Sequence, residues 1–219
     1  YLHRDRDWSP TQGRFICWER KRGKLLELSA LIAGRPIRSG RDVVRSGDAD
    51  RLTDVRYVIT LDSDTQLPRD SARRLVETMA HPLNPPHNAD RPGAPGRGFV
   101  IVQPRVSTSL PSATATPFTR LFTAPEGTDP YTQAVSDVYQ DLAGEATYHG
   151  KGIYEPREFL RRLGNRFAED RILSHDLIES CFARCGFLND VEVIEDHPAT
   201  RPADARRRHR WVRGDWQIA

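Results

Sequence analysis

Two carboxylates one residue apart, Asp62 and Asp64, directly follow the apolar run formed by residues 57–61. Such a run, followed by a Thr-Gln-Leu-Pro turn, predicts a buried strand whose carboxyl end carries both side chains. Open α/β sheets bind their ligands outside the carboxyl ends of their strands. Mg²⁺ and Mn²⁺ are usually held by one or two carboxylates together with substrate phosphates. The pattern therefore predicts a site for Mg²⁺ or Mn²⁺ carrying a diphosphate; the alternative is a solvated acidic turn.

A third carboxylate, Asp176, follows Ser174 and His175 at the predicted start of a helix. The helix dipole and the free N–H groups of a first helical turn keep a carboxylate ionised, so that it can accept a proton. Asp176 is therefore a candidate general base, and the alternative is an ordinary charge at a helix N-terminus. We expect His175 to pack rather than to take part in catalysis.

Basic side chains gather in two segments. Arg207 and Arg210 lie three residues apart, so they share a helix face and can form forks for phosphate oxygens. The indole of Trp211 beside them offers an apolar plane for a sugar ring or a base. The alternative is a solvated basic helix or a nucleic-acid patch. A second basic segment opens the first predicted helix and contains Lys21, Arg22 and Lys24, for which an exposed basic face is the alternative.

The composition describes a soluble globular chain with enough apolar material for a core. The chain has 219 residues, which fits one domain, with 37% hydrophobic and 29% charged residues. The formal net charge of +3 does not indicate a nucleic-acid partner. The three cysteines form neither a disulfide framework nor a metal-binding spacing. No export signal and no apolar run of 18 residues occurs, and we expect the chain to be part of a longer protein.

Strands alternate with helices along the chain. This alternation predicts an α/β fold with a mostly parallel central sheet flanked by helices. A proline-rich segment, 81–98, and a Ser/Thr/Pro-rich segment, 107–117, are predicted to be loops. The predicted strands are 56–61, 98–103 (ended by Pro104) and 187–195; the predicted helices are 19–33, 70–80, 131–142, 156–164, 175–184 and a last one that begins at Pro202. Residues 144–154 are predicted to be extended.

The order of these motifs resembles that of the processive inverting glycosyltransferases, such as cellulose and hyaluronan synthases. Those enzymes carry D-x-D, then an acidic triplet, then Q-x-x-R-W. This chain departs from the pattern twice, because Ser-His-Asp replaces the acidic triplet and Arg207 replaces the glutamine. Long strings resemble, more narrowly, the glycosyltransferase domain of cyclic β-1,2-glucan synthases. These strings include WERKRGKLLEL at 18–28, YVITLDSDTQLPRDSARRLVETMAHPLN at 57–84, RILSHDLIES at 171–180 and RRHRWVRGDWQ at 207–217.

The resemblance implies a GT-A-like glycosyltransferase domain over residues 1–219 that lacks the N-terminal part of the nucleotide-binding fold. It implies inverting transfer of glucose from UDP-glucose to a growing β-1,2-glucan. In this scheme Asp62 and Asp64 hold Mg²⁺ or Mn²⁺, and Asp176 is the general base. The diphosphate would be bound by Arg207, Arg210, Lys21, Arg22 and Lys24, and the acceptor by Trp211, Gly150 and Lys151. The partner would be the remainder of a membrane-bound synthase at the cytoplasmic face of the bacterial inner membrane.

Two alternatives stay open. A basic nucleic-acid-binding module would use the arginines of residues 201–213, with Trp211 and Trp216 as stacking surfaces. The nearly neutral total charge and the carboxylates at a strand end argue against it, so no nucleic-acid partner is expected. The other alternative is that the chain is inactive outside its parent synthase. A tight turn is an equal alternative to an acceptor-binding role for Gly150 and Lys151.

Overall fold

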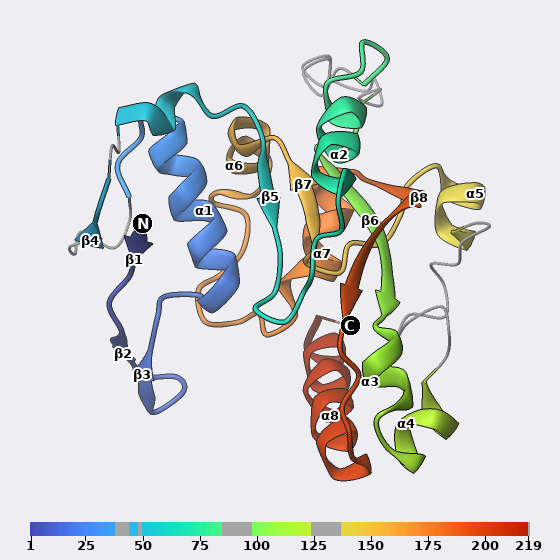
Figure 1. Cartoon of the computed structure of the whole chain (residues 1–219). Coiled ribbons are helices and arrows are strands. Elements are labelled where there is room, and N and C mark those ends of the chain that lie inside the picture. Colours follow the sequence, from blue (N-terminus) through green and yellow to red (C-terminus); the bar gives the residue numbers. More distant parts are fainter. Residues whose placement is uncertain (38–43, 48–49, 85–97, 124–136, 219) are drawn as a thin grey trace.

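The computed structural model describes residues 1–37, 44–47, 50–84, 98–123 and 137–218 (Figure 1). In these residues the chain is mixed α/β, with a four-stranded sheet in the order β5-β7-β6-β8. The strands are β5 (Val58–Thr60), β7 (Gly152–Tyr154), β6 (Ile101–Thr108) and β8 (Cys185–Glu195). The predicted α/β class is confirmed, and the strands fall in or near the predicted segments.

The prediction of a mostly parallel sheet is wrong. β7 pairs antiparallel with both β5 and β6, and only β6 and β8 pair in parallel. The sheet is therefore mixed, although β5, β6 and β8 run in one direction. β7 is a three-residue strand between glycines and a helix. So short a segment has no sequence signal for its direction, and the alternation of elements alone suggested parallel strands.

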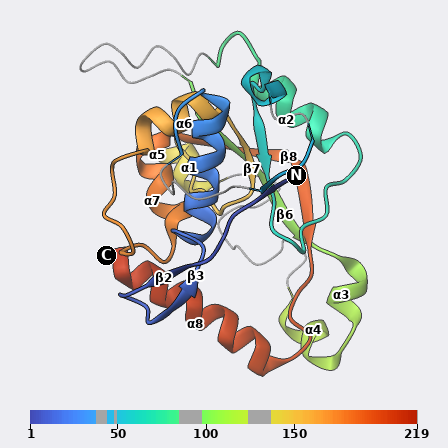
Figure 2. The same cartoon turned by 90° about the vertical axis from the view of Figure 1, so that its left-hand side faces the viewer.

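Helices cover both faces of the sheet (Figure 2). On one face lie α1 (Arg20–Ile32), α6 (Pro156–Leu163) and α7 (His175–Ala183), and on the other lies α2 (Ser71–Met79). The core is accordingly divided into two clusters. The larger cluster joins the first group of helices to Ile101 and Tyr154, and the smaller joins α2 to Val102 and Ile153. The register explains this division, because Ile101 pairs with Tyr154 and Val102 with Ile153, and adjacent residues of a strand face opposite sides.

Gly152 at the start of β7 lies unusually close to β6. A Cβ built there would be 2.3 Å from the carbonyl oxygen of Val102, and φ of Gly152 is +146°. Both facts favour glycine at this position, since other residues rarely adopt this backbone conformation. The close contact lets β7 lie between β5 and β6.

Two predicted boundaries in the middle of the chain are wrong. β6 does not end at Pro104 but continues to Thr108, with a register irregularity between Pro104 and Arg105. A bulge is one of the few places where a sheet accepts proline, which has no N–H to donate. The predicted loop 107–117 contains α3 (Leu110–Thr114), and α4 (Pro117–Phe122) follows it. The predicted helix 131–142 is observed as α5 (Val138–Ala143), and residues 131–136 lie outside the described part.

Small elements surround this core at the N-terminus. Two short antiparallel pairs, β1 (Leu2–His3) with β4 (Val44–Arg45) and β2 (Asp7–Ser9) with β3 (Arg14–Ile16), precede or flank α1, and a 3₁₀ helix covers Asp50–Asp54. The last helix, α8 (Arg201–Ile218), lies beyond the carboxyl ends of β6 and β8 (Figure 1). Within the described residues, no helix combines the length and the apolar character that a membrane span requires.

Candidate functional site

Charged side chains from four parts of the chain meet where β5 and β8 end. Asp62 follows β5, and its carboxylate accepts a hydrogen bond from Nζ of Lys21 on α1. The other Asp62 oxygen lies 3.3 Å from Nζ of Lys151, which immediately precedes β7. Nζ of Lys151 is also 2.9 Å from the carboxylate of Glu195 at the end of β8. The site is thus a network of two lysines and two carboxylates, in which Lys151 connects the two acids.

A loop fixes the position of Asp62 relative to β8. The Asp62 amide donates to the Thr65 hydroxyl (3.2 Å), which in turn donates to Glu195 (2.8 Å). Two backbone hydrogen bonds between Gln66 and Ile194 hold the same loop against the strand. The segment after β5 therefore bends back onto the end of β8, which brings Asp62 close to Glu195.

The lysines set the ionisation of this network. Burial alone would raise the pKa of Asp62, but the hydrogen bond from Lys21 and the charge of Lys151 outweigh it and lower that pKa below its usual value. Burial alone would lower the pKa of Lys151, but the carboxylates of Glu195 and Asp62 outweigh it and raise that pKa. Both effects favour the charged forms, so Asp62 and Lys151 are ionised at neutral pH.

Asp176 faces the same point from α7. One of its carboxylate oxygens, Oδ1, accepts hydrogen bonds from the Ser174 hydroxyl (3.1 Å) and the Leu177 amide (3.2 Å). The other oxygen, Oδ2, lies 3.3 Å from where a Cβ on Gly150 would be, and that Cβ would be 3.5 Å from Nζ of Lys21. Nζ of Lys21 donates to the Gly150 carbonyl at 2.7 Å. Gly150, at φ +81°, is therefore the narrow point where Asp176 and Lys21 approach each other.

His175, the neighbour of Asp176, turns into the protein. Its Nδ1 lies 2.9 Å from a carboxylate oxygen of Glu179, whose side chain is 1% exposed. Burial alone would lower the pKa of His175, but the charge of Glu179 and its hydrogen bond outweigh it and raise that pKa. His175 thus forms a buried ion pair, in agreement with the expectation that it packs.

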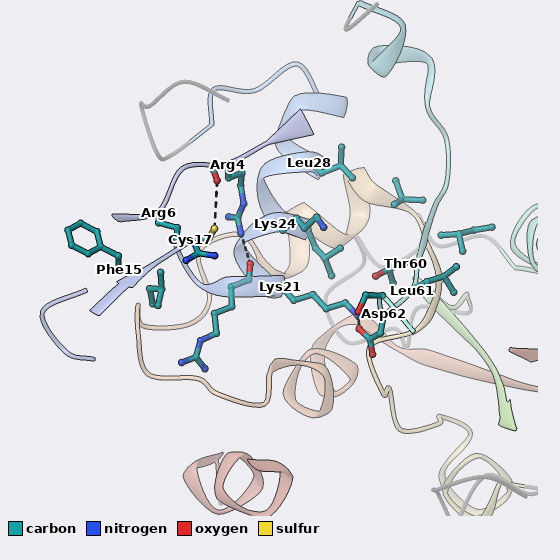
Figure 3. Close-up of a pocket in the computed structure, with 16 residues that line it drawn as sticks. Arg4, Arg6, Phe15, Cys17, Lys21, Lys24, Leu28, Thr60, Leu61 and Asp62 are labelled. Carbon is teal, nitrogen blue, oxygen red and sulfur yellow. Dashed lines mark hydrogen bonds and ion pairs between the residues drawn. The ribbon is translucent and has the colours of Figure 1, made fainter. Parts of the chain in front are cut away.

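An open hollow of about 640 Å³ adjoins this network (Figure 3). Basic side chains of α1 and of the segment between β1 and β2 line one part, and apolar side chains of β5 line another. Figure 3 shows Lys21 extending from α1 to Asp62 at the end of the hollow. The basic lining comprises Arg4, Arg6, Arg20, Lys21 and Lys24. An anionic ligand next to Asp62 would therefore meet an excess of positive charge.

Arg22, predicted to bind a diphosphate, lies elsewhere. Its side chain is 4% exposed, pairs with Glu19 at 2.7 Å and lies over the ring of Phe167. The helical periodicity of α1 explains why Arg22 differs from its neighbours. Lys21 and Lys24, three residues apart, line the hollow, while Arg22 faces the core. Its observed contacts are those of a structural ion pair.

Arg207, Arg210 and Trp211, predicted to bind the diphosphate and the acceptor, lie on α8. Arg207 donates to Asp204 at 3.0 Å, and its guanidinium lies 4.9 Å from the centre of the Trp211 ring. Arg210 and Trp211 are exposed. α8 itself contacts the start of α7, because a Cβ on Gly214 would be 2.6 Å from Cβ of Ser174. The structure thus links α8 to Asp176, while Arg207 is engaged within its own helix.

The predicted metal site has few possible protein ligands. Among the described residues, no group of three or more His, Cys, Asp and Glu side chains lies close enough to hold an ion. Asp64 is exposed and follows the same strand as Asp62. Mg²⁺ bound with a diphosphate needs only one or two carboxylates, because phosphate oxygens and water complete its coordination. Asp62 and Asp64 supply carboxylates of the kind that such a metal uses, and in this structure both oxygens of Asp62 are paired with Lys21 and Lys151.

Glu195 and Thr65 were missed in the sequence. Glu195 ends β8 as Asp62 follows β5, so a charged residue at a second strand end was the available signal. Thr65 carries no such signal, since its role depends on the loop that brings it to Glu195.

Fold and site together define a mixed α/β domain with an ionised network at the ends of its strands. A scan against models of protein families matches none of them. The chain is similar to the protein named cyclic β-(1,2)-glucan synthase NdvB of Rhizobium meliloti (strain 1021), with 44% identity over 221 residues. The match covers 99% of the chain and 8% of that relative's length. The similarity indicates a relation to a part of a bacterial glucan synthase, because the chain spans less than a tenth of that relative's length.

Proposed function

We propose that these residues belong to the catalytic domain of an inverting glucosyltransferase with a GT-A-like fold, which extends a β-1,2-glucan with glucose from UDP-glucose. One observation carries the proposal: Asp176 Oδ2 and Lys21 Nζ converge on Gly150, beside the Asp62 network at the strand ends. A carboxylate base and a cation for a leaving group are the two charges that such a transfer needs. The 44% identity to a glucan synthase supports the choice of substrate class.

In this mechanism Asp176 is the general base. Its free oxygen takes the proton of the acceptor 2-hydroxyl as that oxygen bonds to the anomeric carbon of glucose. The bond between that carbon and UDP breaks in the same step, and its electron pair leaves with UDP. Because a single displacement inverts the anomeric centre, an α-linked donor gives a β-linked product. A positioned base of this kind contributes about 10²–10⁴-fold in rate.

Positive side chains stabilise the departing UDP. Lys21 and Lys24 line the hollow beside Asp62, and Arg207 and Arg210 of α8 complete the proposed diphosphate site. Asp64 with Asp62 would hold Mg²⁺ or Mn²⁺, which supplies neutralisation of charge on the diphosphate when bound. Trp211, Gly150 and Lys151 are proposed to contact the acceptor glucan. The parent protein is proposed to be a membrane-bound synthase, with this domain at the cytoplasmic face of the inner membrane.

The test separates binding from transfer. UDP is titrated into the chain by calorimetry with and without Mn²⁺, and glucose transfer is measured in the longer protein that carries the chain. Asp176→Asn should abolish transfer and leave UDP affinity within about twofold, whereas Asp64→Ala should remove the Mn²⁺-dependent part of binding. Glu77→Gln, which changes an exposed side chain of α2, is the control.

Two results would contradict the proposal. Loss of UDP binding in Asp176→Asn would assign that residue to the nucleotide site, and Mn²⁺ dependence unchanged in Asp64→Ala would remove the metal role. Oligonucleotide binding that weakens steeply with salt, without UDP binding, would favour the nucleic-acid alternative. UDP binding absent from the folded chain but present in the longer protein would mean that the site needs the parent synthase.

A further inference from the structure

Gly214 lies in a tight contact between α8 and the start of α7. It is buried although most of α8 is exposed. A Cβ on Gly214 would be 2.6 Å from Cβ and 3.2 Å from the backbone nitrogen of Ser174. Cβ atoms do not approach to 2.6 Å, so any larger residue would push Ser174 or α8 away.

Gln217 makes a second contact one turn further along α8. Its side-chain oxygen accepts a hydrogen bond of 2.9 Å from the backbone N–H of Leu173. Gly214 and Gln217 are three residues apart, so they lie on the same face of the helix. Together they hold the two residues that immediately precede α7. We call this contact, formed by Gly214 and Gln217 with Leu173 and Ser174, the α8 seat.

The α8 seat connects directly to the carboxylate of Asp176. The hydroxyl of Ser174 donates to Asp176 Oδ1 at 3.1 Å, and the Leu177 amide donates to the same oxygen at 3.2 Å. These two bonds fix the rotation of the carboxylate, because they leave Oδ2 facing Gly150 and Lys21. Displacement of Ser174 would therefore turn Oδ2 away from the point where the charges converge.

We propose that Gly214 and Gln217 are positioning residues, which set the orientation of Asp176 through Ser174 and touch neither donor nor acceptor. The catalytic consequence rests on the proposed function, whereas the orientation of Asp176 does not. The α8 seat also joins the helix of Arg207, Arg210 and Trp211 to the helix of the base. The packing of α8 against the start of α7 then also orients the carboxylate of Asp176.

The first test is made on the 219-residue chain and needs no activity. Hydrogen exchange of the Leu177 amide reports its bond to Asp176. Gly214→Ala should speed this exchange by about tenfold or more, because the bond is disrupted when Ser174 moves. Gln217→Leu, which leaves the crowded contact intact, should speed exchange at the Leu173 amide. Val212→Ala is the control, because Val212 is two residues from Gly214 and 53% exposed. It should change the exchange rate of neither the Leu177 amide nor the Leu173 amide.

The second test measures transfer in the longer protein. Gly214→Ala should lower kcat by about 10- to 100-fold, the effect expected of a misplaced catalytic group, with KM for UDP-glucose within about twofold. Ser174→Gly removes the clashing Cβ, so adding Gly214→Ala to that variant should cost no further activity.

The outcomes test the positioning role of Gly214 and Gln217 separately from the proposed glucosyl transfer. Unchanged exchange of the Leu177 amide in Gly214→Ala would overturn the positioning role of Gly214. The same role would be overturned if Gly214→Ala lowered kcat as much in the Ser174→Gly background as in the wild type. A rise in KM without a fall in kcat would also overturn it. If the longer protein transfers no glucose from UDP-glucose, the proposed function fails, and the exchange measurements still decide the orientation of Asp176.

Discussion

At the scale of single residues, the ion pair of His175 and Glu179 makes stability depend on pH. The folded-state pKa of His175 is raised, so folding is stabilised by this pair below the unfolded value of about 6.5. The stabilisation is lost as pH rises through the folded value, because neutral His175 leaves the charge of Glu179 buried without a partner. We expect the free energy of unfolding in urea to fall as pH rises above about 6.5 and passes through the raised pKa of folded His175.

The matched variant for this prediction is His175→Gln. It removes the titrating group, so its stability should depend less on pH over the same range than that of the wild type. Equal pH dependence in the two proteins would assign the effect to another of the seven histidines.

The residues of the site were predictable one by one, but their meeting was not. The sequence indicates Asp62 and Asp176 as carboxylates at a strand end and a helix start, and it indicates Lys21 through the resemblance to glycosyltransferases. That Lys21 reaches both Asp62 and Gly150 depends on how α1 packs, which no local pattern encodes. The burial of Arg22 was missed for the same reason, since one position along a helix decides which face a side chain occupies.

At the scale of elements, β7 depends on Gly152. Gly152→Ala should destabilise the fold by about 2–4 kcal/mol, because the new Cβ would collide with the Val102 carbonyl and φ would remain positive. Gly144→Ala is the matched control: its φ is also positive, at +73°, but no atom lies within 4 Å of the new Cβ. It should cost only about 1–2 kcal/mol, the strain of the backbone alone.

Urea unfolding of both variants measures the difference. Similar losses would mean that the close approach of β7 and β6 relaxes at little cost. A much larger loss in Gly152→Ala would establish that the contact itself holds β7 in place.

Helix positions were predicted better than strands. The helices at 20–32, 71–79 and 156–163 follow from apolar spacing and, for the last, from proline in its first turn. β6 was predicted too short because proline ordinarily ends a strand, and the bulge that accommodates Pro104 arises from pairing with β8. Local signals fix helices, whereas the ends of strands depend on distant partners.

At the scale of the whole molecule, the sheet separates two apolar clusters. Leu163 belongs to the cluster of α1, α6 and α7, and Leu75 to the cluster of α2; their exposed fractions are 1% and 0%. Leu163→Ala and Leu75→Ala should each cost about 2–5 kcal/mol, the usual range for buried leucines. Because the clusters lie on opposite faces, the double variant should lose the sum within about 0.5 kcal/mol.

A second pair provides the comparison. Leu25 and Leu163 belong to the same cluster, so the Leu25→Ala/Leu163→Ala double variant should deviate from additivity by more than about 0.5 kcal/mol. Strong coupling between Leu75 and Leu163 would mean that the two faces of the sheet do not unfold independently.

The position of β7 between β5 and β6 also constrains how the chain folds during synthesis. Among the described residues, β5 and β6 leave the ribosome before β7, and neither pairs with the other in the finished sheet. At about 5–20 residues per second, the interval between β5 and β7 is on the order of 10 s. During it, first β5 and then also β6 present unpaired backbone edges to other nascent chains and to chaperones. β5 and β6 can join in one sheet only after Gly152–Tyr154 emerges, and β8 is added later, so a three-residue strand late in the chain decides when the sheet begins to assemble.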